Sequence, residues 1–217
     1  MTGSIVDRVH QACEQALGLC GGTALEAEVA AVRERLSGPL RVAIAGRVKA
    51  GKSTLLNALV GERLAATDAT ECTRLVTTYR FAPTSTVNAQ LVDGTTVPAR
   101  FRLEDGALRI DPGDDPDMVS GLEVGWPCRI LNSMVLIDTP GLASLDAATS
   151  RRTQDFLDVD GPAGSGADAV VYLMRHLHAA DAAFLGAFMD RGVTGASPVN
   201  AVAVLSRADE VGACRPD

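Results

Sequence analysis

The chain has 217 residues, of which 47% are hydrophobic and 22% are charged, values that are typical of a globular protein and exclude disorder, collagen and coiled coils. Twenty Lys and Arg residues against 27 Asp and Glu residues give a formal net charge of −7, so stable binding to nucleic acid is not expected. The longest apolar runs, residues 169–174 and 199–205, are far shorter than the ~20 residues of a membrane-spanning helix. Residues 1–6 lack the features of a secretory signal, which predicts a cytoplasmic location.

The first elements in chain order are two helices. Residues 4–19 carry apolar side chains at helical spacing, and Ser4 with Asp7 forms a possible capping pair. A pair of glycines ends this helix, and Thr23 then caps a second helix over residues 24–36, which stops at a Ser-Gly-Pro sequence. The chain therefore opens with a helical hairpin.

A doubly wound α/β domain is predicted after the hairpin. Residues 40–45 form a continuous apolar run that ends at a glycine, as expected of a strand buried on both faces. Similar runs occur at residues 134–137, 169–174 and 200–205, and a helical pattern occupies residues 179–191. Strands that alternate with helices in this way indicate a central parallel sheet.

The segment between the first two central strands has a different composition. It is rich in β-branched residues and contains two Asp-Gly turn sequences. We interpret it as an antiparallel insertion at one edge of the sheet, with strands at residues 75–81, 87–91, 96–102, 108–110 and 122–126.

Three groups of residues, one acidic stretch, two histidines and the cysteines, give only weak indications of a metal or redox site. The acidic stretch at residues 111–117 lacks the spacing of a calcium loop, so a solvated turn is favoured over an ion site. His176 and His178 have no evident third metal ligand, which favours a loop or packing role. The cysteines are odd in number and scattered, so buried free thiols are expected at Cys13, Cys20, Cys72, Cys128 and Cys214.

A phosphate-binding motif follows the first central strand. The sequence from Gly46 to Ser53 matches G-x-x-x-x-G-K-[ST] between a strand and a helix. Gly46 and Gly51 permit positive φ, so backbone N–H groups can surround the phosphates at a helix N-terminus. Lys52 can reach the β- and γ-phosphates, and the Ser53 hydroxyl can ligate Mg²⁺. The candidate phosphate-binding residues are Gly46, Arg47, Val48, Lys49, Ala50, Gly51, Lys52, Ser53 and Thr54.

A second motif, D-T-P-G, follows the next central strand. Asp138 stands at the carboxyl end of that strand, where ligands bind in open α/β sheets. It can hold Mg²⁺ through water, and the backbone N–H of Gly141 can approach the γ-phosphate. Alone this sequence is a common turn; after a phosphate loop and an apolar strand it indicates a nucleotide site.

The last central strand ends in the sequence Ser206-Arg207-Ala208-Asp209, which resembles the [NT]-K-x-D base-recognition motif of GTPases. A carboxylate at Asp209 suits guanine, because N1–H and the N2 amino group of guanine are both donors. Arg207 can lie along the base plane as the lysine stem would. Since two positions of the motif are substituted, an ordinary polar turn stays open as the alternative.

Together the segments G-R-V-K-A-G-K-S-T-L-L-N-A-L, A-T-E-C-T-R, D-T-P-G and S-R-A-D resemble a bacterial dynamin-like GTPase. The chain is most similar to the isoniazid-inducible dynamin-like proteins of mycobacteria and their relatives. The resemblance covers residues 40–212 and, less specifically, the N-terminal helices. The 86 residues that separate Lys52 from Asp138 leave room for the antiparallel insertion that dynamin-type domains carry.

The resemblance implies a P-loop GTPase domain of dynamin type over residues 39–217. Its fold class is α/β, with a mostly parallel sheet and an antiparallel extension. The helical hairpin of residues 1–38 would be part of a stalk or neck bundle. Because only eight residues follow Asp209, we expect the domain to be incomplete at its C-terminal end and the chain to be a fragment of a longer protein.

The resemblance also implies roles for individual residues. Thr73 would ligate Mg²⁺ and position the attacking water, with Thr70 as the alternative. Lys49 stands where eukaryotic dynamins have a Ser that helps to hold a monovalent cation, so it either supplies that charge itself or is an ordinary exposed lysine. Leu142 follows Gly141 where Ras-like enzymes have a glutamine, so another group must position the water. The candidate catalytic residues are Lys52, Thr73 and Lys49, and the candidate metal ligands are Ser53, Thr73 and Asp138.

The leading hypothesis is a dynamin-like protein that binds GTP with Mg²⁺ and hydrolyses it to GDP and phosphate. Its partner would be a second copy or a paralogous dynamin-like protein, bound through the GTPase face. Membrane lipid would be contacted by regions absent from this chain, at the inner face of the cell membrane. One alternative is a nucleotide-gated interaction module with negligible hydrolysis. Another is a regulatory GTPase without a membrane role, against which the helical hairpin argues.

Overall fold

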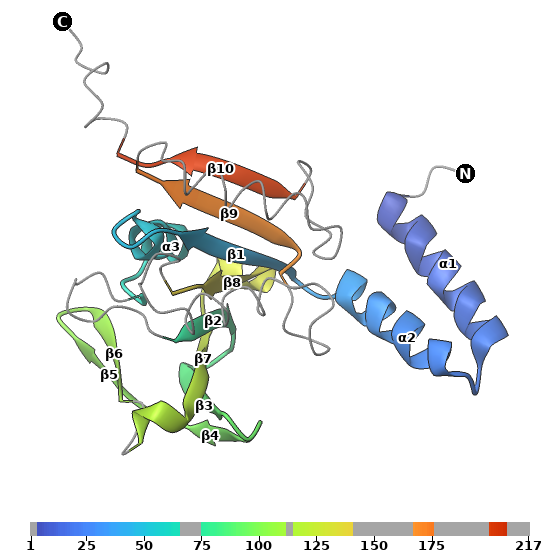
Figure 1. Ribbon diagram of the computed structural model, residues 1–217, viewed down its shortest axis with the longest axis horizontal. Coiled ribbons are helices and arrows are strands. Elements are labelled where there is room, and N and C mark those ends of the chain that lie inside the picture. Colours follow the sequence, from blue (N-terminus) through green and yellow to red (C-terminus); the bar gives the residue numbers. More distant parts are fainter. Residues whose placement is uncertain (1–3, 66–74, 112–114, 141–166, 176–199, 208–217) are drawn as a thin grey trace, which may run out of the picture. The chain divides into compact units, whose positions relative to one another are not determined.

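The computed structural model describes residues 4–65, 75–111, 115–140, 167–175 and 200–207. The chain separates into two compact units, Met1–Pro39 and Leu40–Asp217. The first unit consists of α1 (Ile5–Cys20) and α2 (Ala24–Ser37), which pack against each other as a hairpin (Figure 1). Among the described residues, no helix is long and apolar enough to cross a membrane.

The two helices of the hairpin begin differently. At α1 the predicted capping box is confirmed, because the Asp7 carboxylate accepts the backbone N–H of Ser4 at 2.9 Å and the Ser4 side chain caps the first turn. Thr23 stands at the predicted N-cap position of α2, but its side chain does not cap that helix. Its hydroxyl instead donates to the carbonyl oxygen of Cys20 at 2.6 Å, which also accepts the backbone N–H of Thr23 at 3.0 Å.

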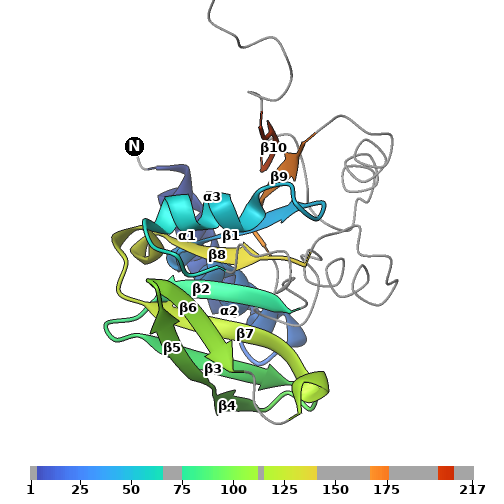
Figure 2. The same cartoon turned by 90° about the vertical axis from the view of Figure 1, so that its left-hand side faces the viewer.

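The parallel part of the sheet lies in the second unit. Its strands run in the order β10-β9-β1-β8, and all neighbouring pairs among them are parallel. The helix α3 (Lys52–Val60) follows β1 and packs on β1 and β8 (Figures 1 and 2). The predicted central strands are confirmed as β1 (Leu40–Gly46), β8 (Met134–Asp138), β9 (Ala169–Met174) and β10 (Ala201–Leu205). The helix predicted at 179–191 lies outside the described residues.

The sheet continues past β8 in the order β2-β7-β3-β4 (Figure 2). These strands are β2 (Val76–Phe81), β3 (Thr86–Leu91), β4 (Thr96–Pro98) and β7 (Val119–Trp126). All pairs in this extension are antiparallel except β2 with β7, which is parallel. The prediction of a wholly antiparallel insertion is therefore wrong in one pair. The reason is that β2 and β3 run in opposite directions and β7 lies between them. A strand that is antiparallel to β3 is therefore parallel to β2.

The single strand predicted at 96–102 is two strands in different sheets. The strand β4 ends at Pro98, which has no N–H to donate. The next residue, Ala99, donates its N–H to the carbonyl oxygen of Val87 at 2.9 Å. The chain then leaves the main sheet and forms β5 (Arg100–Glu104), which pairs with β6 (Ala107–Asp111) as a separate two-stranded sheet.

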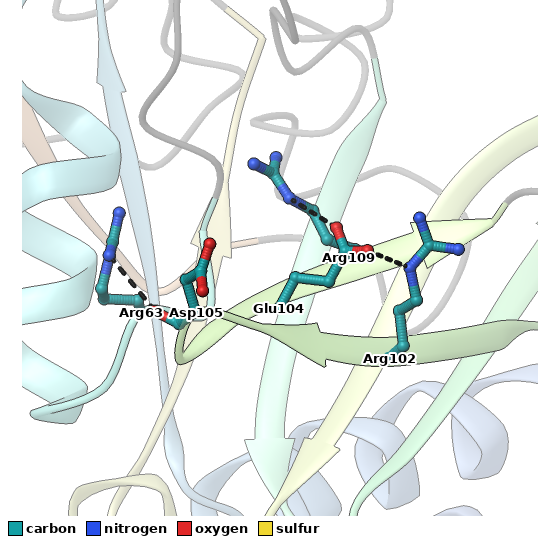
Figure 3. Close-up of polar contacts among 5 residues, drawn as sticks. All are labelled: Arg63, Arg102, Glu104, Asp105 and Arg109. Carbon is teal, nitrogen blue, oxygen red and sulfur yellow. Dashed lines mark hydrogen bonds and ion pairs between the residues drawn. The ribbon is translucent and has the colours of Figure 1, made fainter.

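The outer face of the β5–β6 hairpin carries paired charges (Figure 3). Arg102 and Arg109 are opposite each other in the register, and like charges in this position repel. The carboxylate of Glu104 lies 2.8 Å from Arg102 and 3.8 Å from Arg109, which offsets that repulsion. The predicted Asp-Gly turn is present, with positive φ at Asp105, whose carbonyl oxygen accepts from the Arg63 guanidinium at 3.5 Å.

Two short 3-10 helices complete the described elements. The first, η1 (Pro116–Met118), lies in the stretch that was expected to be a solvated turn, and η2 (Arg129–Asn132) precedes β8. Of the cysteines in the described part, Cys13 is buried, Cys20 and Cys128 are half-buried, and none is paired. No cluster of three or more His, Cys, Asp or Glu side chains suited to a metal ion occurs within the described ranges.

The core lies on both faces of the parallel strands. In β1, Ala43, Ile44 and Ala45 have no exposed surface, which confirms the prediction of a strand buried on both faces. Ile44 packs in one apolar cluster with Leu56 of α3, whereas Ala43 and Ala45 belong to a second cluster with Tyr172 of β9. The carboxyl end of β1, where the phosphate motif begins, is therefore held firmly from both sides.

Candidate nucleotide-binding site

The phosphate loop, residues 46–53, joins β1 to α3 and requires glycine at two positions. Gly46 has φ 143° and Gly51 has φ 96°, so both predicted positive-φ positions are confirmed. A Cβ atom on Gly46 would collide with the carbonyl oxygen of Leu173, the residue beside it in β9. Gly51 is the residue before the first turn of α3. The loop thus passes close to β9 and delivers Lys52 and Ser53 to the start of a helix, where backbone N–H groups favour an anion.

Both lysines of the chain lie in this loop. Lys52 folds back over it, with Nζ donating to the carbonyl oxygens of Gly46 at 3.1 Å and Arg47 at 3.2 Å. Phosphate oxygens could replace these acceptors without moving the ammonium far. Lys49 is exposed and has φ 64°, a left-handed conformation that costs a non-glycine residue roughly 1–2 kcal/mol. Such strain is often found where a loop approaches a ligand.

Asp138, at the carboxyl end of β8, is a buried carboxyl group. It lies beside Ile44 in the register and is 1% exposed. Neither of its oxygens has a hydrogen-bond partner among the described residues. Burial raises the pKa of Asp138 to about 6, against the opposing influence of the Lys52 ammonium. Burial of the Tyr79 side chain, together with the charge of Asp138, holds the pKa of Tyr79 well above its usual range.

These features fit a hydrated divalent cation. A buried carboxylate that lacks donors is costly, and a cation with water ligands supplies both opposite charge and O–H donors. The Ser53 hydroxyl, in the first turn of α3, would offer a second oxygen of the kind that Mg²⁺ prefers. Thr139 holds the end of β8 in place, because its hydroxyl donates to the carbonyl oxygen of Ile44 at 3.0 Å and its backbone N–H donates to the same oxygen at 3.3 Å.

The start of the S-R-A-D sequence lies at the same edge of the sheet. The backbone N–H and the hydroxyl of Ser206 donate to the carbonyl oxygen of Met174, at 2.8 and 3.3 Å, at the end of the neighbouring strand β9. Arg207 is exposed and has φ 53°. These residues follow β10 and the phosphate loop follows β1, two parallel strands that are separated by β9, so both segments lie at the carboxyl ends of the strands. The remaining predicted site residues, Thr70, Thr73, Gly141, Leu142 and Asp209, lie outside the described residues.

Three residues near this site were missed by sequence reasoning. Leu173 shapes the loop only through its backbone, and Tyr79 reaches Asp138 from a strand of the extension, so neither leaves a signal in the sequence. Asn57 did leave a signal in the sequence, because asparagine has a low helix propensity and stands here inside a predicted helical segment. Its side chain makes two hydrogen bonds to Ala65.

The chain is similar to several known proteins. The family model described as 50S ribosome-binding GTPase matches residues 41–191. Isoniazid-induced protein IniC of Mycobacterium tuberculosis is 46% identical over 189 residues, which cover 84% of this chain and 37% of that protein. The bacterial dynamin-like protein of Nostoc punctiforme is 32% identical over 124 residues, covering 51% of this chain and 18% of that protein.

The fold is also found in solved structures. A structure described as an oligomerised bacterial dynamin pair, with a mechanism for the long-range sensing and tethering of membranes, matches with a TM-score of 0.61. The identity is 20%, and the match covers 98% of this chain and 33% of that one. The chain thus spans about a third of the length of the IniC and dynamin-pair chains. It belongs to the GTPase family that the matching model describes, and within that family it is similar to the bacterial dynamin-like proteins.

Proposed function

We propose that this protein binds GTP with Mg²⁺ at the phosphate loop and hydrolyses it to GDP and phosphate. The observation that carries the proposal is Asp138, a buried carboxyl group with no hydrogen-bond partner in the described part of the chain, which feels the charge of Lys52. A fold retains such a destabilised group where a ligand compensates for it. Membership of a GTPase family supports the choice of substrate.

Each part of the loop has a proposed role. The backbone N–H groups of residues 46–54 surround the phosphates, and Lys52 exchanges its two carbonyl acceptors for β- and γ-phosphate oxygens. Ser53 and Asp138 would hold Mg²⁺, directly and through water respectively. Bound there, the ion would neutralise charge on the phosphates. Gly141 contributes a backbone N–H to the γ-phosphate.

The hydrolytic step needs a group that positions water. We assign this to Thr73, with Thr70 as the alternative. Lys49 would act as an internal cation that offsets charge developing on the transferred phosphate. Its exposure and its left-handed backbone support this role, because the loop keeps a strained lysine where glycine would relieve the strain.

The proposed base is guanine, recognised by the Asp209 carboxylate with Arg207 along the base plane. Ser206 is bonded through its backbone N–H and its hydroxyl to the carbonyl oxygen of Met174 at the end of β9, which supports a fixed start for this segment. A rigid start is what a specific base pocket needs, since recognition by hydrogen bonds depends on placement.

Partners and location are proposed from the relatives. A homodimer, or a pair with a paralogous dynamin-like protein, would form through the GTPase face. Membrane lipid would be contacted by parts of the family's fold outside the GTPase domain, from the cytoplasmic side of the cell membrane. The hairpin α1–α2 would join a stalk bundle. Its exposed apolar side chains support this, with Ile5 77% and Leu19 89% exposed.

A second candidate is a nucleotide-gated interaction module that binds GTP with negligible hydrolysis. Two observations favour it. Leu142 replaces the water-positioning glutamine of Ras-like enzymes, and Arg207 replaces the lysine of the base motif.

Release of phosphate at multiple turnover, measured together with the equilibrium affinity for GTP, tests the proposal. The wild type should bind GTP and release phosphate in a Mg²⁺-dependent manner, with and without liposomes present. Lys52→Ala should abolish nucleotide binding or turnover while keeping the fold, because Lys52 is a charge on phosphate and not a core residue. Arg129→Ala is the control for loss of one positive charge, since Arg129 is exposed on η2.

The outcomes separate the candidates. Binding with no phosphate release by the wild type would favour the interaction module. Wild-type affinity in Lys52→Ala, measured by calorimetry, would contradict the assignment of the phosphate loop.

A further inference from the structure

The strand β5 is the open edge of the two-stranded sheet that it forms with β6. All five of its residues are exposed. The opposite edge of this sheet is occupied, because the N–H of Leu108 in β6 donates to the carbonyl oxygen of Arg63 at 2.9 Å. Among the described residues, β6 is the only strand whose backbone is bonded to β5. An exposed edge of this kind is a template for pairing with another strand.

The pairing with β6 determines which backbone groups of β5 face outward. Since the N–H of Leu108 points to Arg63, the pair of Leu103 with Leu108 is not hydrogen-bonded. Hydrogen-bonded and non-hydrogen-bonded pairs alternate along an antiparallel ladder, so Phe101 with Ile110 is also of the second kind. The N–H and C=O groups of Phe101 and Leu103 therefore point away from β6, toward the open edge.

The sequence of β5, R-F-R-L-E, is complementary to itself when read in the opposite direction. If two copies of β5 pair antiparallel about Arg102, Phe101 of each copy lies opposite Leu103 of the other. These are the residues whose backbone groups face outward, so both pairs are hydrogen-bonded pairs. Their side chains are 36% and 57% exposed, and they would gain an apolar cross-strand partner.

The charges of β5 agree with the same register. Arg100 at one end of the strand would lie opposite Glu104 of the second copy, which gives an opposite-charge pair at each end. Arg102 would lie opposite itself, and like charges in this position repel. The Glu104 carboxylate, 2.8 Å from Arg102 in the same chain, offsets this repulsion (Figure 3).

We propose that β5 is an association surface for a second copy of this chain, whose own β5 pairs with it antiparallel about Arg102. The contact is isologous, and it joins two hairpins into one four-stranded sheet with the order β6-β5-β5-β6. Two five-residue strands bury less than the roughly 1,200 Å² of a stable interface. The association is therefore weak and depends on protein concentration. It requires no nucleotide, so it is independent of the proposed function.

The first test is disulfide cross-linking of Arg102→Cys under a mild oxidant, without nucleotide. The proposed register places the two copies of residue 102 in a non-hydrogen-bonded pair, with Cα atoms about 4.5 Å apart. A disulfide spans Cα distances of about 4.4–6.8 Å. Arg109→Cys is the matched control, because it removes the same charge from the same face of the hairpin but lies on β6. Its two copies would be about 14 Å apart, three strand spacings.

Arg102→Cys should form a covalent dimer at least about tenfold faster than Arg109→Cys. The wild type gives the background from the five natural cysteines. Equal rates for Arg102→Cys and Arg109→Cys would overturn the proposal. Association through the GTPase face or through the α1–α2 hairpin would raise the mass of the protein without favouring residue 102, so such a result also counts against β5.

The second test uses charge variants in sedimentation equilibrium, again without nucleotide. The average mass of the wild type should rise with concentration, and Arg100→Glu should abolish the rise because it places two carboxylates opposite each other. Arg129→Glu, an equal charge change on η2, should behave as the wild type. A mixture of Arg100→Glu with Glu104→Arg should associate again, since each end then pairs opposite charges. A wild type that is monomeric at all concentrations, or an unaffected Arg100→Glu, would overturn the proposal.

The fluorescence of Trp126 checks that each variant keeps its hairpin in place. The ring of Phe101 lies edge-on to Trp126, with 6.5 Å between the ring centroids, so displacement of β5 should change the emission. Glu104→Arg loses the ion pairs of Glu104 with Arg102 and Arg109 and is the variant most exposed to this risk. The cross-linking test keeps Glu104 and decides the question if that hairpin is disturbed.

Discussion

Asp138 should make the nucleotide-free protein less stable as the pH rises. Burial raises the pKa of this carboxyl group from 3.8 to about 6, and neither oxygen has a hydrogen-bond partner among the described residues. Between these two pH values the folded protein keeps a proton that the unfolded chain has released. The folded state therefore binds more protons, and the free energy of unfolding falls with increasing pH.

The magnitude follows from the shift. A rise from 3.8 to about 6 is about 2.2 pH units, which corresponds to about 3 kcal/mol of stability lost between pH 4 and pH 7. An asparagine at this position carries no charge at any of these pH values. Asp138→Asn should therefore raise the free energy of unfolding at pH 7.5 by up to about 3 kcal/mol, and change it little at pH 4.

The assay is urea unfolding of the wild type and Asp138→Asn at pH 4, 6 and 7.5, without nucleotide or Mg²⁺. The difference between the two proteins is the quantity to follow, because other groups titrate equally in both. Asp168→Asn is the matched control. Its carboxylate accepts the backbone N–H of Arg41 at 2.9 Å, so this substitution should not stabilise the protein.

Bound ligand should reverse the order of stability of the wild type and Asp138→Asn. Mg²⁺ and GTP should stabilise the wild type by mass action and stabilise Asp138→Asn much less.

Two results without ligand would refute the reasoning. One is that Asp138→Asn is less stable than the wild type at pH 7.5, and the other is that the difference in the free energy of unfolding between the two proteins does not change with pH. Asp138 would then be an ordinary, satisfied part of the core.

Three further predictions concern single residues. Gly46→Ala should lower the free energy of unfolding by about 2 kcal/mol or more, because its Cβ would collide with the carbonyl oxygen of Leu173; a wild-type melting temperature would contradict this. Thr73→Ala should keep GTP affinity within about tenfold and lower kcat roughly 10²-fold, whereas an unchanged kcat in single-turnover kinetics would move the role to Thr70. Asp209→Asn should weaken GTP and improve xanthosine triphosphate in competition titrations, since the new amide can donate to the 2-oxo group; an unchanged base preference would make S-R-A-D an ordinary turn.

Features that depend on neighbouring residues in the chain could be predicted from the sequence. The capping box at Ser4 and the positive φ of Gly46 and Gly51 follow from local hydrogen bonding and backbone sterics. The buried central strands follow from apolar runs that end in glycine or polar residues, and the position of Asp138 follows from one of those runs. These patterns were sufficient to identify the family and to place the candidate phosphate and metal residues at one edge of a sheet.

Features that depend on which segments become neighbours were decided only by the tertiary structure. The Thr23 hydroxyl donates to the end of α1 and not to the first turn of α2, and β7 runs parallel to β2 because it inserts beside β3. The isolation of Asp138 arises in the same way. Its sequence context specifies a carboxyl group at a strand end, but its pKa depends on how completely the folded protein surrounds it, and none of the residues that the structure describes donates a hydrogen bond to it. Burial and pairing are set by long-range closure of the chain, and no local pattern encodes the distance between residues that meet only after folding.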